Sequence, residues 1–104
     1  MTTGAERRRN ARYACHASVE IEWGSEVLRA VISDLSASGM FIVTREPLWM
    51  RAEFSARILD GQRLLVNCVV KRVEPGRGMG VEFTEIPLDS RKPLEEYLWK
   101  LAGG

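Results

Sequence analysis

Residues 15–33 read CHASVEIEWGSEVLRAVIS, and this stretch decides the fold. Over residues 15–23, apolar and polar side chains alternate. Successive side chains of a strand point to opposite faces of its sheet, so this period of two predicts a half-buried strand. Gly24-Ser25 is typical of a two-residue hairpin turn, and a second strand is expected over roughly residues 26–33. The folded part of the chain therefore begins with an antiparallel hairpin.

Four more strand patterns follow, separated by residues that form turns. Pro47 ends the third strand, and Asp60-Gly61 favours a turn between the fourth and the fifth. Glu74-Pro75-Gly76-Arg77 separates the fifth strand from the sixth. These strands are expected at residues 40–44, about 53–59, about 64–73 and 78–83. Six short strands joined by tight turns predict an all-β fold, a closed or nearly closed antiparallel barrel.

The end of the chain has a helical period. Four side chains recur at i, i+3, i+4 and i+7, on one face of a helix: Leu94, Tyr97, Leu98 and Leu101. We expect Asp89 or Ser90 to cap this helix and Pro93 to lie in its first turn, where a missing N–H does little harm. Gly103-Gly104 ends it. Because such a short helix is only marginally stable alone, it should pack on the barrel or on a partner.

The composition is that of one globular domain. The chain has 104 residues, enough for one modest core, and 45% of them are hydrophobic. No stretch approaches the roughly 20 apolar residues that span a bilayer, and residues 1–12 lack the apolar segment of a signal peptide. We therefore expect a cytoplasmic protein that does not insert into a membrane.

Residue types that support metal binding or catalysis are scarce. His16 is the only histidine, and Cys15 and Cys68 lie far apart. A tetrahedral zinc site needs more ligands, so we expect no metal site, and both thiols are predicted to be reduced and within the core. With one histidine and no phosphate-binding loop, the chain is expected to have no catalytic residues and no cofactor. The sequence favours a binding protein over an enzyme.

Positive charge is concentrated near the N-terminus. The formal net charge is only +1, which disfavours a broad basic surface for DNA or RNA. Residues 6–12, ERRRNAR, nevertheless contain four arginines beside one glutamate, a pattern that indicates a local anion site. Few apolar side chains precede the first strand. Residues 1–13 are therefore expected to form a flexible arginine-rich arm, and residues 14–104 the barrel with its helix.

Two of these arginines, Arg8 and Arg12, have an RxxxR spacing. Residues four apart lie on one side of a strand and close to one side of a helix, so both side chains can grip one ligand. Guanidinium groups match phosphate oxygens or the O6 and N7 of guanine. On the spacing alone, a solvated tail remains an alternative.

A second motif, DxSxxG, covers residues 34–39. Asp34 and Ser36 would point to one side if the backbone stays extended. A carboxylate can accept the two hydrogen bonds that guanine offers from N1–H and its exocyclic amine. Gly39 would allow a positive φ or a close backbone approach. Asp and Ser in a turn also commonly bond their own backbone, which is the alternative interpretation.

In their order along the chain these features resemble the PilZ domain family of bacterial proteins. The resemblance rests on RRxxxR at residues 7–12, DxSxxG at 34–39, GMGVEF at 78–83 and the closing helix. It extends from about residue 6 to residue 101. It implies a six-stranded antiparallel barrel whose ligand is cyclic di-GMP. The arginine motif would bind phosphates and guanine edges, and DxSxxG would bind a guanine.

Carried over to this chain, the resemblance gives a set of ligand-binding residues. Some members of the family place an aromatic residue late in the fifth strand to stack on guanine. Here Arg72 lies in that neighbourhood and could stack its guanidinium plane instead, the alternative being an exposed residue without a role. An arginine directly before RxxxR goes with binding an intercalated pair of ligand molecules. The expected set is Arg7, Arg8, Arg12, Asp34, Ser36, Gly39 and Arg72.

Three functions are compatible with these observations. The favoured one is a cyclic di-GMP receptor that orders its arm on binding and signals to an unidentified effector protein. The second is a PilZ-like adaptor that binds only proteins. The third is a small barrel for single-stranded nucleic acid, which the balanced charge and the aromatics within apolar strand patterns disfavour. Trp99 lies off the apolar face of the helix, where it could contact a partner or the barrel.

Overall fold

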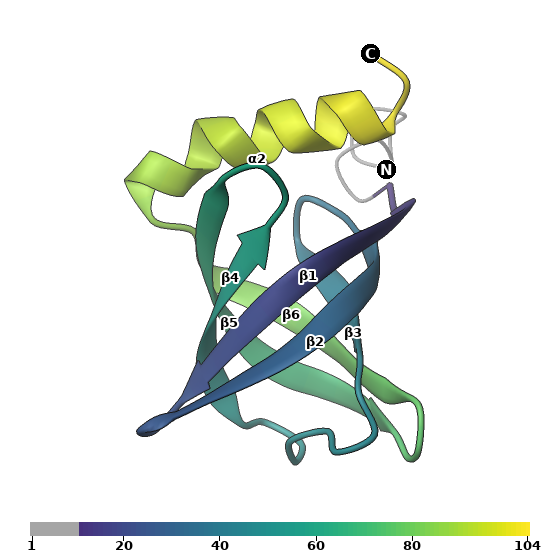
Figure 1. The fold of residues 1–104 in the computed structure, drawn as a ribbon, viewed down its shortest axis with the longest axis vertical. Helices are drawn as coiled ribbons and strands as arrows, with labels where there is room; N and C mark the ends of the chain where they lie inside the picture. Colours follow the sequence, from purple (N-terminus) through teal and green to yellow (C-terminus); the bar gives the residue numbers. More distant parts are fainter. Residues whose placement is uncertain (1–10) are drawn as a thin grey trace, which may run out of the picture.

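Six antiparallel strands close into a barrel in the computed structural model, which describes residues 11–104 (Figure 1). Around the barrel their order is β1-β2-β3-β6-β5-β4, and β4 pairs back to β1. The predicted all-β barrel with a terminal helix is therefore confirmed. The strands are β1 (Tyr13–Trp23), β2 (Glu26–Leu35), β3 (Gly39–Val43), β4 (Glu53–Leu59), β5 (Arg63–Glu74) and β6 (Gly78–Glu85).

The first hairpin is longer than its sequence pattern predicts. β1 begins at Tyr13 rather than at Cys15, and β2 continues past Ser33 to Leu35. The reason is pairing, because Tyr13 lies opposite Leu35 in the ladder between the two strands. Asp34, which follows the expected end of the second strand, is thus a residue of β2.

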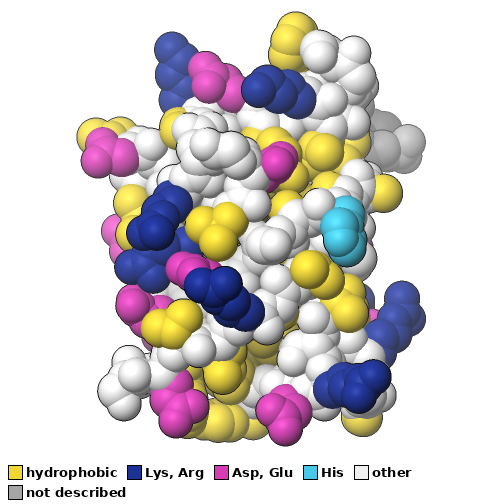
Figure 2. Space-filling view, in the orientation of Figure 1, with side chains coloured by type: hydrophobic (Ala, Val, Ile, Leu, Met, Phe, Trp, Pro, Cys, Tyr) yellow, Lys and Arg dark blue, Asp and Glu magenta, His cyan; other side chains and the backbone are white. Residues whose placement is uncertain are grey.

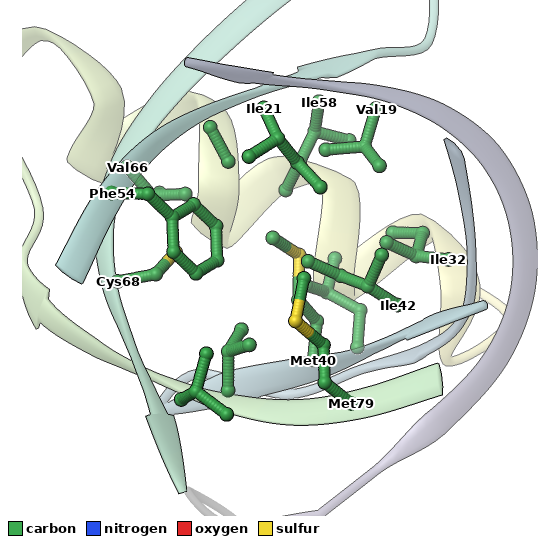
Figure 3. Packing of buried hydrophobic residues seen from close by; sticks show 14 of the residues in the cluster. Val19, Ile21, Ile32, Met40, Ile42, Phe54, Ile58, Val66, Cys68 and Met79 are labelled. Atoms are coloured by element: carbon green, nitrogen blue, oxygen red, sulfur yellow. The ribbon is translucent and has the colours of Figure 1, made fainter. Parts of the chain in front are cut away.

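Alternation along each strand places one set of side chains inside the barrel. In β1 the predicted inner face, from Cys15 to Trp23, is buried or half-buried, while most of the intervening residues are exposed. Figure 3 shows inner-face side chains of several strands meeting in one cluster. Isoleucine and valine from four strands fill much of this core: Val19, Ile21, Ile32, Ile58 and Val66. Their burial is the main stabilising term of the fold.

Helix α2 (Leu88–Leu101) lies across one end of the barrel, against β5 and β1 (Figure 1). Leu94 is buried, and the other three residues of the predicted apolar face pack against the core. Tyr97 packs against the core, and burial, followed by its interaction with the Asp60 carboxylate, raises the pKa of its hydroxyl group. Within residues 11–104, no helix is long and apolar enough to cross a membrane.

The start of α2 differs from the prediction. The helix begins at Leu88, after Pro87, and no side chain caps it, so the expected cap by Asp89 or Ser90 is wrong. Instead the N–H of Ser90 donates to the carbonyl oxygen of Pro87 at 2.8 Å, within the first turn. Pro93 therefore lies inside the helix rather than in its first turn. Lacking an N–H, it leaves the carbonyl four residues earlier without its helical donor.

Both cysteines are free thiols, as predicted. Cys68 is buried in the core, and burial raises its pKa to about 12. Cys15 is only half-buried. Burial, followed by the negative charges of Asp34 and Asp60, raises its pKa as well. Both thiols are therefore protonated and weakly reactive near neutral pH.

Core packing predicts that valine-to-alanine substitutions at two positions have very different effects on the free energy of unfolding. Val66 is 0% exposed inside the barrel, whereas Val27 is 55% exposed on β2. Val66→Ala removes two buried methyl groups and should lower the free energy of unfolding by about 2 kcal/mol. The control Val27→Ala should change it by less than about 0.5 kcal/mol. Chemical denaturation followed by tryptophan fluorescence measures both, and equal losses would contradict the barrel interior described here.

Candidate ligand-binding site

A row of residues crosses four strands on the outer surface of the barrel. Asp34 of β2 lies opposite Phe41 of β3, Phe41 opposite Gly80 of β6, and Gly80 opposite Arg72 of β5. The row runs across the pairing of β3 with β6. It brings DxSxxG and the late part of the fifth strand, far apart in sequence, onto one surface.

Two β-bulges set the orientation of this row. The register of β2 against β3 shifts between Ile32 and Asp34, and that of β5 against β6 shifts between Val70 and Arg72. In β5 the shift places two consecutive residues, Lys71 and Arg72, on the exposed side, after strict alternation up to Val70. A bulge re-aims side chains locally. Here it turns Arg72 outward beside Gly80.

Arg12 meets Asp34 at one end of the row. Its Nη1 donates to Oδ1 of Asp34 at 2.7 Å, in an ion pair whose side chains are 52% and 31% exposed. Ala14, two residues later in β1, is paired with Asp34, so the strand ladder holds Arg12 near the carboxylate. Arg12 of the RxxxR motif and Asp34 of the DxSxxG motif are thus in direct contact.

Ser36 shapes the loop between β2 and β3. Its side chain is 1% exposed, and its hydroxyl donates to the carbonyl oxygen of Gly39 at 3.2 Å. The same hydroxyl accepts the N–H groups of Ser38 and Gly39, each at 3.2 Å. Ser36 therefore bonds its own loop and does not share the exposed side of Asp34. For Ser36 the structure therefore has the alternative interpretation, in which the side chain bonds its own backbone, whereas Asp34 pairs with Arg12 instead.

Gly39 permits a close backbone approach. A Cβ at this position would collide with the carbonyl oxygen of Val81 in β6. The neighbouring Ser38 carbonyl accepts the N–H of Phe83 at 2.8 Å, which ties the loop to the same strand. Of the two uses predicted for this glycine, the structure has the close approach and not a positive φ.

A shallow hollow of about 170 Å³ lies at the end of the row that contains Gly80 and Arg72. It joins Arg12, from the start of the chain, to Arg72, from β5. Lys71, which sequence reasoning did not select, also lines it and pairs with Glu82 at 3.8 Å. The sequence shows Lys71 directly before Arg72, but strand alternation would place the two side chains on opposite faces. The bulge turns both of them outward. The full lining is Arg12, Ser38, Lys71, Arg72, Gly80, Val81 and Glu82.

Beyond this hollow the charge is mixed. On the face seen in Figure 2, Lys and Arg side chains are interspersed with Asp and Glu. In the described part of the chain, no group of three or more His, Cys, Asp or Glu residues is placed to hold a metal ion. Arg7 and Arg8, also predicted to bind the ligand, lie outside the described residues.

Comparisons with known proteins agree with this architecture. The PilZ domain of YcgR from Escherichia coli, solved with c-di-GMP, has a TM-score of 0.74 and 18% identity, covering 92% of each chain. The Bacillus subtilis inhibitor of motility MotI/DgrA has a TM-score of 0.71 and 21% identity over 93% of this chain. The PilZ domain of CeSA from a cellulose-synthesizing bacterium has a TM-score of 0.67 and 24% identity, covering 88% of this chain and 98% of that chain.

At these identities the solved structures establish the shared fold alone. This chain spans 54% of the length of MotI/DgrA, about half of that protein. A search of curated proteins gave no match. A sequence model of the PilZ domain, however, matches residues 6–99, which is nearly the whole chain. Together with the closed six-stranded barrel, this match shows that the chain belongs to the PilZ domain family.

Proposed function

We propose that this chain is a receptor for cyclic di-GMP. The observation that carries the proposal is the direct contact between the two motifs, Arg12 on Asp34 at 2.7 Å, beside a hollow that also contains Arg72. Cations that bind phosphate and a carboxylate that binds guanine are thereby adjacent, as a ligand with both groups requires. The E. coli YcgR domain of the same family was solved with this ligand.

Each residue has a proposed role. Arg8 and Arg12 bind phosphates and guanine edges, and Arg7 adds a third guanidinium for an intercalated pair of ligands. The Asp34 carboxylate accepts guanine N–H groups. Ser36 and Gly39 act indirectly, because they fix the loop between β2 and β3 instead of offering groups to the surface. Arg72 stacks its guanidinium plane on a base.

The signal is proposed to pass to an effector protein through the surface between the beginning of β1 and α2. A largely apolar hollow of about 210 Å³ lies between Ala11, Tyr13 and the exposed Trp99 of α2, and Ala37 of the β2–β3 loop lines it too. Trp99 is 68% exposed, and exposed tryptophans are frequent anchors of protein interfaces. Any ordering of the arm would change this surface, so a partner could distinguish the bound receptor from the free one.

Calorimetric titration with cyclic di-GMP tests the binding site. Arg12→Gln removes a charged hydrogen-bond donor and should weaken binding by about 1.5–3 kcal/mol, roughly 10- to 150-fold. The matched control is Arg29→Gln, an exposed arginine of β2 that pairs with Glu20 and does not line the hollow. Its affinity should equal that of the wild type. No heat from wild-type protein with micromolar ligand, or equal affinity for GTP, would contradict the proposal.

The same titration gives the stoichiometry. An intercalated pair of cyclic di-GMP molecules has more phosphate charge than one molecule, and Arg7 supplies the extra cation beside RxxxR. We expect two ligands per chain for the wild type and a shift toward one for Arg7→Leu. A wild-type ratio of one would refute binding as a pair while leaving the receptor function intact.

Hydrogen exchange tests whether the ligand orders the arm. Residues 1–12 offer little apolar surface to bury, and fixing a residue costs roughly 1–2 kcal/mol, so their amides should exchange freely without ligand. With ligand, amides of residues 7–12 should become protected. Amides of β5 serve as the control, protected in both states by the barrel. Arm amides that are already protected without ligand would mean a preformed site.

A further inference from the structure

Phe41 is a buried aromatic residue on the outside of the barrel. Its neighbours Met40 and Ile42 belong to the core cluster, so Phe41 points to the opposite face. It is nevertheless only 4% exposed. Two guanidinium groups cover it, with the Cζ atoms of Arg72 and Arg77 at 5.8 and 5.5 Å from the ring centroid. At these distances the ring attracts both cations.

Glu74 joins the two arginines. Nε of Arg72 donates to Oε2 of Glu74 at 2.9 Å, and Nη1 of Arg77 donates to Oε1 at 3.1 Å. Each carboxylate oxygen thus holds a different guanidinium. We define Phe41, Glu74 and Arg77 as the support cluster of Arg72.

The hairpin between β5 and β6 fixes this geometry. Arg72 and Glu74 are two residues apart in β5, so their side chains lie on one face. The turn that follows is closed by the Arg77 N–H, which donates to the Glu74 carbonyl oxygen at 2.9 Å. The ring of Phe41 and the carboxylate of Glu74 therefore hold Arg72 from different sides.

We propose that Phe41, Glu74 and Arg77 are positioning residues that hold Arg72 ready to stack on a guanine of cyclic di-GMP. This inference rests on the proposed function. An unsupported arginine loses much rotational freedom when it binds, whereas a held one has already lost it, which raises affinity. The support cluster also keeps the guanidinium plane beside the hollow that contains Arg12. The guanidinium group held in this way supplies the rigid flat surface that an aromatic side chain offers in some other members of the family.

Two glutamates provide a matched test. Glu74→Gln and Glu22→Gln each remove one negative charge that pairs with an arginine, Arg72 or Arg57, and neither glutamate lines the hollow. Loss of a negative charge alone should slightly strengthen binding of an anion. We therefore expect Glu22→Gln to bind cyclic di-GMP as tightly as the wild type or slightly more tightly. Glu74→Gln should bind about three- to tenfold more weakly because Arg72 is released.

NMR of arginine side chains follows the support cluster directly. In wild-type protein without ligand, the Nε–H of Arg72 should be protected from exchange, and Arg72→Lys identifies its resonance. Glu74→Gln should abolish this protection and Glu22→Gln should retain it. Phe41→Leu should also weaken binding, with recovery in Phe41→Tyr, which keeps the ring. Thermal denaturation verifies that each variant is folded.

The outcomes separate the two proposals. If wild-type protein binds no cyclic di-GMP, the receptor function fails and the stacking role fails with it. If the wild type binds but Glu74→Gln and Glu22→Gln have equal affinities, the receptor stands and the positioning role is overturned. An unprotected Arg72 Nε–H in the wild type also overturns it.

Discussion

The close approach of β3 to β6 is the constraint on which the rest of the structure depends. Gly39 and Gly78 stand at the two ends of this pairing. At each position a Cβ would collide with a carbonyl oxygen of the facing strand, that of Val81 or that of Ile42. Through this contact the sheet β1-β2-β3 joins the sheet β6-β5-β4, and the β1–β4 pairing then closes the barrel. A side chain at either glycine would separate the two halves.

The candidate site lies across this contact, so it exists only in the closed barrel. Asp34 belongs to one half and Arg72 to the other, and the row between them crosses from β3 to β6. The bulges in β2 and β5 lie at its two ends, where the local twist turns polar side chains outward. The geometry of the candidate site and the stability of the fold are thus linked. Residues that keep the strands paired also determine the distance between the carboxylate and the guanidinium.

The periodic spacing of apolar residues made three features predictable: the strands, the inner face of β1 and the packed face of α2. Each of them depends on side chains that are neighbours in sequence. Features that depend on a facing segment were not predictable. Tyr13 is a strand residue because Leu35 lies opposite it, and Arg72 turns outward because the register against β6 shifts. Phe41 has the sequence pattern of a core residue, yet arginines from a distant hairpin bury it on the outer surface. For Ser36 the sequence allowed two hydrogen-bonding patterns, and only the loop geometry distinguishes them.

The ion pair between Arg12 and Asp34 determines how an anionic ligand could enter this site. Both side chains are substantially exposed, and exposed pairs contribute only about 0–1 kcal/mol to stability. Charge-assisted hydrogen bonds are individually stronger, so breaking this contact would cost an anionic ligand little compared with the bonds that it could form. In the structure, the pair keeps the Arg12 guanidinium and the Asp34 carboxylate near the hollow, and their opposite charges neutralise each other. The start of β1 is therefore attached to the site by an interaction weak enough to be exchanged, while the glycine-mediated contact between β3 and β6 keeps the barrel itself unchanged.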